Sequence, residues 1–212
     1  VPRQIIINST PQEARVATME NARLLEIQIE RVRERSMAGS ICKGRVLRVL
    51  PGMQAAFVDI GIEKAAFLHA SDLLQPTLPP EVAREGDGAD LVEGAAPARD
   101  VAPIEQRLQK GQDVLVQVSK EPIGTKGARV TANLSLPGRF LVYMPDTRHI
   151  GISRRIEDGA ERDRLRDIVE SERPPEGGFI VRTAAEGATK RELHDDIRFL
   201  TRLWARVRKT AE

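Results

Sequence analysis

The pattern of hydrophobic and polar positions divides the chain into three parts. In residues 3–30, β-branched and alternating stretches such as Leu25, Ile27 and Ile29 predict three short strands, two of them joined by a turn at residues 20–21. Strands joined so closely bury little apolar surface, so we expect this β-rich piece to pack on another part of the protein.

The second part, up to residue 134, has the pattern of a small barrel. Five strands are predicted at 40–50, 55–60, 65–69, 113–120 and 128–134. This number and spacing favour an OB-fold, a five-stranded barrel whose sheet face binds oligonucleotides. Residues 75–103, between the third and fourth strands, are rich in Pro, Gly, Ala and acidic residues, and we expect them to form a mobile insertion.

Beyond residue 136 the pattern changes to mixed strands and helices. Strands are predicted at 139–144 and 178–183, and a helix at 158–171. A capping box, Thr189 with Glu192, marks the start of a second helix. Its apolar positions at helical spacing are Leu193, Ile197, Leu200, Trp204 and Val207. The predicted fold class is therefore mixed and mainly β: a five-stranded OB-fold barrel, an α+β domain after it and a β-rich piece before it.

Composition and charge limit the class of protein and the cell compartment that we expect. The apolar runs are far shorter than the roughly 18 residues that span a bilayer, and no secretory leader opens the sequence, so we expect no membrane segment. The single cysteine, Cys42, cannot form an internal disulfide or a Cys-x-x-Cys zinc site, which favours the reducing cytoplasm. The net charge of +2 is unevenly spread, because residues 81–100 hold six acids and leave the remainder more basic.

Two of the seven aromatic residues (five Phe, one Tyr, one Trp) lie beside polar residues in predicted barrel strands. By strand alternation, Phe57 shares a face with Asp59, and Phe67 shares a face with His69. Two rings on the open face of an OB sheet would form a stacking platform for bases. Alternation alone leaves open that both rings fill the barrel interior, because short barrels bulge and invert their faces.

Basic residues accompany this face and would attract phosphate groups in a salt-dependent manner. They are Lys43, Arg45 and Arg48 on the first barrel strand, Lys64 at a turn, and Lys126 in the loop 124–127. Surface lysines are common, so these residues support RNA binding only together with the rings.

A second candidate site lies at 177–184, where two glycines lead into an apolar strand that ends in Arg182 and Thr183. A guanidinium and a hydroxyl at a strand end can hold a terminal phosphate, with added donors from the small-residue turn 184–187. The alternative is structural, with Arg182 paired to a surface carboxylate and Thr183 ending a strand. The residues alone favour this alternative.

No catalytic or metal-binding constellation is predicted in the sequence. The three histidines, His69, His149 and His194, lack partners at metal-ligand spacing. Asp195 and Asp196 are adjacent on a predicted helix and point about 100° apart, so we expect them to form a solvated face. Ser153 lies in a basic turn without a predicted base, so no hydrolytic site is indicated.

Several blocks in order along the chain resemble the bacterial ribonuclease E/G family. They are 44–49 (GRVLRV), 51–61 (PGMQAAFVDIG), 64–73 (KAAFLHASDL), 111–118 (GQDVLVQV), 124–129 (GTKGAR), 141–145 (LVYMP), 151–157 (GISRRIE) and 178–187 (GFIVRTAAEG). The resemblance implies part of a ribonuclease-H-like subdomain at 1–36, an OB-fold RNA-binding domain at 37–131 and a truncated 5′-sensor domain at 132–212.

The resemblance also implies roles for individual residues. Those matching the family's clamp on single-stranded RNA are Phe57, Phe67 and Lys126. Those matching its 5′-monophosphate pocket are Arg182, Thr183, Arg154 and the main-chain groups near Gly138 and Val142. These matches favour the exposed position of Phe57 and the phosphate-binding role of Arg182.

Family enzymes cleave RNA with Mg²⁺ held by aspartates of a DNase-I-like domain, and a zinc link through a Cys-x-x-Cys segment joins their subunits. Neither feature occurs in these 212 residues. We therefore expect this chain to bind RNA without cutting it. The resemblance implies a cytoplasmic parent protein, a homo-oligomeric Mg²⁺-dependent endoribonuclease of single-stranded RNA that acts in rRNA maturation and RNA turnover.

Two alternatives remain open. The chain could be a stand-alone OB-fold RNA-binding module without nuclease activity. It could also be a protein-interaction scaffold whose barrel face contacts a partner chain, which predicts no salt-dependent affinity for RNA.

Overall fold

The computed structural model describes residues 3–31, 36–73 and 102–212, which divide into two units, Val1–Met37 and Ala38–Glu212. The predicted insertion at 75–103 lies outside the described residues except for its last two positions. No helix of the described part is long and apolar enough to cross a membrane.

The first unit is a three-stranded antiparallel sheet in the order β1 (Arg3–Ser9), β2 (Glu13–Glu20) and β3 (Arg23–Arg31). Asn21 and Ala22 turn β2 into β3 with φ angles of 48° and 61°, the left-handed pair that suits a two-residue hairpin. Ile5 and Ile6 alternate across β1 and are 67% and 54% exposed. Apolar side chains are thus exposed on both faces of this sheet.

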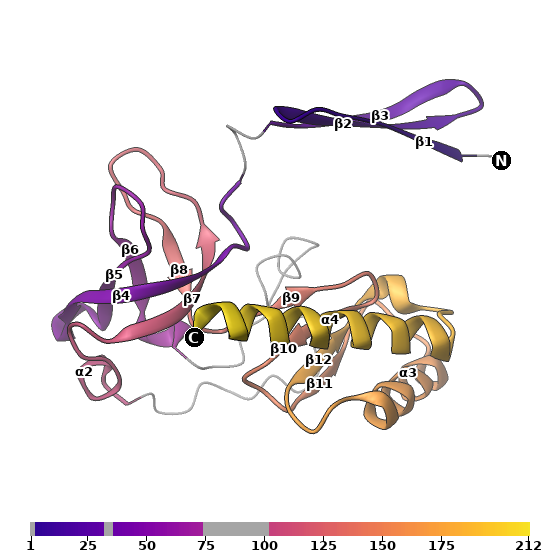
Figure 1. Cartoon of the computed structure of the whole chain (residues 1–212). Coiled ribbons are helices and arrows are strands. Elements are labelled where there is room, and N and C mark those ends of the chain that lie inside the picture. Colours follow the sequence, from indigo (N-terminus) through magenta and orange to yellow (C-terminus); the bar gives the residue numbers. More distant parts are fainter. Residues whose placement is uncertain (1–2, 32–35, 74–101) are drawn as a thin grey trace. The chain divides into compact units, whose positions relative to one another are not determined.

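The second unit begins with a closed five-stranded barrel (Figure 1). Its strands are β4 (Ile41–Leu50), β5 (Ala55–Asp59), β6 (Ala66–His69), β8 (Arg129–Thr131) and β7 (Asp113–Lys120), in that order around the barrel. Only β6 and β8 pair in parallel. The interior is filled mainly by small and β-branched side chains. They include Val46, Ala56, Val58, Ala66, Leu68, Val116, Val118 and Val130. The barrel confirms the predicted OB-fold class.

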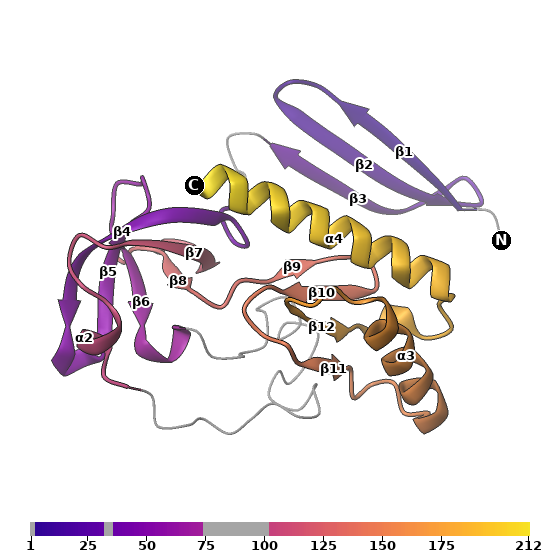
Figure 2. The same ribbon diagram turned by 60° about the horizontal axis from the view of Figure 1, so that its bottom comes forward.

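The chain then forms a four-stranded sheet on which two helices pack (Figures 1 and 2). The sheet order is β11 (Ile150–Ile152), β12 (Gly178–Val181), β10 (Leu141–Met144) and β9 (Leu136–Pro137). Strands β11 and β12 are parallel, and β10 is antiparallel to β12. The ends of β11 and β12 and the start of β10 therefore lie at the same edge of the sheet.

The two helices, α3 (Gly159–Glu172) and α4 (Lys190–Ala211), match the predicted ones closely. In the capping box of α4, Thr189 Oγ1 accepts from the N–H of Glu192 at 3.3 Å, and the N–H of Thr189 donates to Glu192 Oε2 at 2.9 Å. Leu193, Ile197 and Leu200 are buried in one apolar cluster with residues of the sheet and α3. The helical periodicity of this segment was therefore a correct indicator of its buried face.

A buried glutamine links the barrel to the α+β domain. Gln117 of β7 donates through Nε2 to the carbonyls of Gly39 at 3.0 Å and Ser135 at 2.9 Å, and its Oε1 accepts from the N–H of Ser135 at 2.9 Å. Ile41 of β4 packs against the apolar cluster of the α+β domain. Polar and apolar contacts thus hold the start of the second sheet on the barrel.

Five elements differ from the sequence-based predictions. The strand predicted at 128–134 is shorter, because β8 ends at Thr131. Strands β9 and β11 and the short helix α2 (Ile104–Arg107) were not predicted, because two to four residues are too few to show a hydrophobic period. The strand predicted at 178–183 ends at Val181, and a 3-10 turn, η4 (Thr183–Ala185), follows it. This early ending sets Arg182 and Thr183 beyond the strand.

Candidate nucleic-acid interface

Phe57 and Phe67 form a cross-strand pair on the outer face of the barrel. They are direct register partners on β5 and β6, with ring centroids 6.1 Å apart and an edge-to-face angle of 69°. Both are partly exposed, whereas the alternating neighbours Val58 and Leu68 are buried inside the barrel. The outward direction predicted from strand alternation is therefore confirmed, and the interior alternative is wrong.

Polar and basic residues surround this aromatic pair. His69 stacks beside Phe67 with ring centroids 6.5 Å apart and 30° between planes. Arg48 is the register partner of Phe57 on β4, and Arg129 is the register partner of Phe67 on β8. Register partners share a sheet face, so two guanidinium groups flank the rings. One of them, Arg129, is paired with Asp72 at 2.9 Å.

Lys126 lies in a tightly held loop next to the turn before β6. Its N–H and carbonyl are both hydrogen-bonded to Ile123, at 3.0 and 3.2 Å. Lys64 Nζ donates to the carbonyl of Gly124 at 2.7 Å, which ties the two loops together. A Cβ atom at Gly127 would overlap the carbonyl of Ala65, so only glycine permits this close approach. The exposed Lys126 is thus presented by a fixed backbone.

Two of the basic residues predicted to bind RNA make other contacts. Arg45 donates to Asp113 across β4 and β7 at 2.9 Å, and this hydrogen bond lowers the pKa of Asp113. Lys43 Nζ donates to the carbonyl of Ala211, at the end of α4, at 2.7 Å. Lys43 therefore lies at the junction with the α+β domain, away from the aromatic pair.

The second candidate site lies at the edge where β11 and β12 end. Arg182 follows β12, and its Nη1 donates to the carbonyl of Gly138 at 2.8 Å. The hydroxyl of Thr183 lies 3.2 Å from the hydroxyl of Ser153, which follows β11. The structure thus brings together three of the residues predicted for a phosphate site and adds Ser153, which is 7% exposed.

The loop that carries Gly138 is anchored from α4 by Asp196. The Asp196 carboxylate accepts from the main-chain N–H groups of Arg139 at 3.2 Å, Phe140 at 2.9 Å and Leu141 at 3.0 Å. A Cβ atom at Gly138 would lie only 2.6 Å from Asp196 Oδ2. The lack of a side chain at Gly138 therefore makes room for the Asp196 carboxylate at this loop.

The prediction of a solvated face at 195–196 was correct for Asp195 and wrong for Asp196, which is half-buried. Positions 193, 196, 197 and 200 form one i, i+3, i+4, i+7 stripe of α4, so the sequence held a signal that Asp196 faces inward. An acid on an apolar stripe requires hydrogen-bond donors, and the loop before β10 supplies them.

Side chains of helix α3 hydrogen-bond to two turns beside the site, one after β11 and one after β12. Arg162 Nη1 donates to the carbonyls of Ser153 at 2.8 Å and Ile156 at 3.1 Å. Glu161 accepts from the N–H of Gly187 at 2.8 Å and pairs with Arg164 at 2.6 Å. The hydrogen bond from Arg164, assisted by the Gly187 N–H, lowers the pKa of Glu161 from 4.5 to about 2.

Hydrogen bonds at residues 185–187 correct part of one expectation about the turn at 184–187. Its N–H groups were expected to supply donors for a phosphate. The N–H groups of Ala185 and Glu186 instead donate to the carbonyls of Arg182 and Thr183, and that of Gly187 donates to Glu161. The turn therefore supports the position of Arg182 and Thr183.

Two other residues matched to the 5′-monophosphate pocket lie near this edge. Arg154 follows Ser153 and is exposed. Val142 lies within β10, between Pro137 and Ile180, and is 1% exposed. Val142 therefore belongs to the packed wall beneath the edge.

Metal ligation is not indicated in the part of the chain that the structure describes, where no group of three or more His, Cys, Asp or Glu side chains could hold an ion. His194 Nδ1 instead lies 2.7 Å from Glu172, which also pairs with Lys190 at 2.9 Å. The described residues therefore do not form a site for the Mg²⁺ or zinc implied for the longer parent protein.

Comparison with known proteins gives a family match over the α+β part of the chain. Residues 135–212, which include the whole edge with Arg182 and Thr183, match the profile described as the Ribonuclease E/G family. The chain carries a ribonuclease E/G family domain. This domain contains the α+β sheet, α3 and α4.

The similarity extends over the barrel as well as the ribonuclease E/G domain. The chain is 49% identical to ribonuclease G of Haemophilus influenzae over 204 residues, 96% of this chain and 39% of that protein. It is 48% identical to ribonuclease G of Escherichia coli (strain K12) over 205 residues, 96% of this chain and 40% of that protein. It is 38% identical to ribonuclease E of the same strain over 213 residues, 99% of this chain and 19% of that protein. The chain thus spans about two fifths of the ribonuclease G proteins it matches.

Proposed function

We propose that this chain captures single-stranded RNA and senses its 5′-monophosphate for an endoribonuclease of the ribonuclease E/G family. The barrel face with Phe57 and Phe67 stacks on bases, and the edge with Arg182 and Thr183 holds the terminal phosphate. The observation that carries the proposal is the meeting of Arg182, Thr183 and Gly138 at one sheet edge, inside the family domain.

At the sheet edge, the hydrogen bond to Gly138 fixes the plane of the Arg182 guanidinium. A planar guanidinium binds phosphate oxygens through charge-assisted hydrogen bonds, which are shorter and stronger than neutral ones. A 5′-monophosphate carries more charge and more free oxygens than an internal phosphodiester. This group of residues therefore favours an RNA end that carries the monophosphate.

Thr183 supplies a hydroxyl proton to the same phosphate. Ser153 Oγ accepts from the N–H of Arg155 at 3.4 Å and lies 3.2 Å from Thr183 Oγ1. With Ser153 as donor to Thr183, the Thr183 O–H remains directed to the ligand. Ser153 is then a positioning residue for Thr183.

On the barrel, stacking on two rings and contacts of Lys126 with the sugar–phosphate backbone carry little base identity. We therefore expect weak sequence preference. Each phosphate contact on a single strand adds about −0.7 to the slope of log affinity against log salt, so binding should weaken as salt rises.

The relatives are named ribonucleases, and we extend that activity to the longer parent protein of this chain. Mg²⁺-dependent cleavage, zinc-linked oligomers and action in rRNA maturation and RNA turnover belong to this proposal for the parent. Mg²⁺ would supply Lewis-acid activation of the phosphodiester when bound. The described residues of this chain supply substrate capture.

The proposal is tested by the affinity of this chain for one short single-stranded RNA with a 5′-monophosphate or a 5′-hydroxyl, at two salt concentrations. We expect tighter binding of the monophosphate form, and Arg182→Ala should remove that difference while leaving the salt-dependent remainder. Equal affinity of the two RNAs for the unmodified chain would overturn the sensing role of Arg182 and Thr183.

A further inference from the structure

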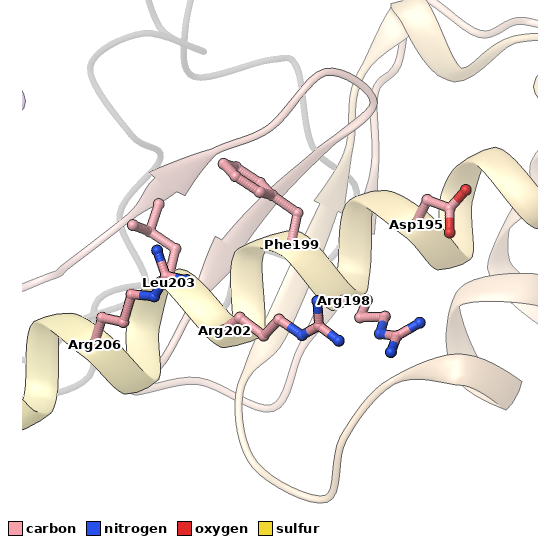
Figure 3. Close-up of a pocket in the computed structure, with 6 residues that line it drawn as sticks. All are labelled: Asp195, Arg198, Phe199, Arg202, Leu203 and Arg206. Carbon is pink, nitrogen blue, oxygen red and sulfur yellow. The ribbon is translucent and has the colours of Figure 1, made fainter.

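A groove runs along α4 (Figure 3). Its lining residues are Asp195, Arg198, Phe199, Arg202, Leu203 and Arg206. Figure 3 shows Arg198 and Arg202 extending to the same side of the helix. Phe199 is 59% exposed, the largest apolar surface on this helix. None of these six residues belongs to the aromatic pair of the barrel, Phe57 and Phe67, or to the sheet edge with Arg182 and Thr183.

The arginines of this groove are not explained by folding. Arg198, Arg202 and Arg206 follow one another at intervals of four residues, which places like charges next to each other on the helix at a cost in stability. Within the described ranges of the chain, no ion pair joins any of the three to an acid. The helix dipole favours cations in the last turn, where Arg208 and Lys209 already lie.

The basic surface continues from α4 onto the barrel. Arg206 also lines a second groove, where the end of α4 meets β4 and β7, together with Lys43, Ile41 and Leu115. Arg198 and Arg206 are eight residues apart, or about 12 Å along the helix axis. Arg198, Arg202, Arg206 and Lys43 thus form one continuous row of cations, the α4 track.

We propose that the α4 track binds the sugar–phosphate backbone of an RNA strand. This surface is separate from the aromatic pair of the barrel and from the sheet edge with Arg182 and Thr183. The inference rests on the proposed function that this chain binds RNA. Charge complementarity selects the occupant, because guanidinium forks match phosphate oxygens and a row of unpaired arginines repels other cationic surfaces. The exposed ring of Phe199 provides a face on which a base can stack.

The test compares RNA affinity and its salt dependence between the unmodified chain and the variant Arg198→Ala, Arg202→Ala, Arg206→Ala. The RNA is a 24-nucleotide single strand with a 5′-hydroxyl, so the monophosphate site is not engaged. We expect a loss of affinity of about tenfold or more, and a salt slope smaller by about 2 because three phosphate contacts are removed. A six-nucleotide RNA, long enough for the platform alone, should bind both proteins alike.

The matched control removes three exposed cations elsewhere, Arg23→Ala, Lys110→Ala and Arg166→Ala. We expect this control to keep the slope and affinity of the unmodified chain, and circular dichroism to show both variants folded. If the alanine variant does not fold, replacing the same three arginines by glutamine, which keeps the aliphatic stem, provides the test.

Equal binding by the track variant and the control would overturn the α4 track and leave the proposed function intact. No RNA binding by the unmodified chain would overturn the proposed function and the track together. Unchanged RNA affinity with an altered molar mass in light scattering would overturn the track in favour of a contact between protein chains.

Discussion

Asp196 on α4 accepts a hydrogen bond from the main-chain N–H of Phe140 at 2.9 Å, 56 residues away in the sequence. The same carboxylate also binds the two neighbouring N–H groups. The loop held in this way begins at Gly138, whose carbonyl accepts from Arg182 at 2.8 Å. One side chain of α4 therefore determines where the carbonyl partner of Arg182 lies.

The first prediction concerns this anchor. Asp196→Ala leaves three main-chain N–H groups without their acceptor, so we expect a loss of about 2 kcal/mol in the free energy of unfolding. The preference for 5′-monophosphate RNA should fall as well, because the Gly138 carbonyl is released. Urea unfolding and RNA binding measure the two effects.

The adjacent, exposed Asp195 gives the matched control for this anchor. Asp195→Ala should change neither quantity. A variant Asp196→Ala that is destabilised but keeps the full monophosphate preference would show that the anchor does not position the phosphate site.

The second prediction concerns the hydroxyl pair of Ser153 and Thr183. Ser153→Ala removes the group that orients Thr183, so we expect the preference for 5′-monophosphate over 5′-hydroxyl RNA to fall about fivefold, near the value of one hydrogen bond. Thr183→Ser keeps the hydroxyl and should keep the preference, whereas Thr183→Val should lose it. Equal preference in Thr183→Val and the unmodified chain would contradict the role of this hydroxyl.

The third prediction concerns the aromatic pair on the barrel. Phe57→Ala with Phe67→Ala should weaken binding of 5′-hydroxyl RNA by about 1–3 kcal/mol for each base that loses its ring. The rings face outward, so the thermal unfolding midpoint should change less than for a core substitution. Replacing both residues by Tyr should retain binding. Undiminished affinity of the double alanine variant would overturn the stacking role.

The fourth prediction uses two glycines of the barrel. Gly127→Ala forces a methyl group against the Ala65 carbonyl, so the Lys126 loop must move and RNA affinity should fall. Gly52→Ala adds a methyl group in open space and serves as the control. Binding of 5′-hydroxyl RNA should distinguish the two. If both variants bind alike, the position of this loop does not matter for RNA.

The fifth prediction is a pH dependence from Glu161, whose pKa is lowered from 4.5 to about 2 in the folded protein. A depressed pKa means that the carboxylate stabilises the fold above pH 4.5, and that this contribution disappears as the pH falls through about 2. Glu161→Gln should therefore unfold at lower urea than the unmodified chain at pH 7.

The difference in the urea concentration of unfolding between Glu161→Gln and the unmodified chain should narrow as the pH is lowered from 4.5 to 3. Glu157→Gln, which replaces an exposed acid just before α3, is the control and should show no such convergence. A gap between Glu161→Gln and the unmodified chain that stays constant down to pH 3 would contradict the pairing of Glu161 with Arg164 and Gly187.

Much of the fold follows from local patterns in the sequence. Alternation along β5 and β6 correctly separated Phe57 and Phe67 from the buried Val58 and Leu68, because successive strand side chains point to opposite faces. The capping box at Thr189 located the start of α4 for a similar reason, since its hydrogen bonds join residues three apart. Burial and capping of this kind depend on neighbours along the chain.

The sheet edge with Arg182 and Thr183 was decided by tertiary structure. Thr183 meets Ser153 because β11 and β12 run parallel and end together, and β11 is too short to show a pattern of its own. Arg182 meets Gly138 because the start of β10 pairs with the end of β12. The sequence placed Asp196 on the apolar stripe of α4, but it could not identify the three N–H groups of the loop before β10 that receive its carboxylate. The physical reason is separation: periodicity reports which face of an element is buried, whereas partners that lie 30 to 57 residues apart are chosen by the packing of the whole sheet.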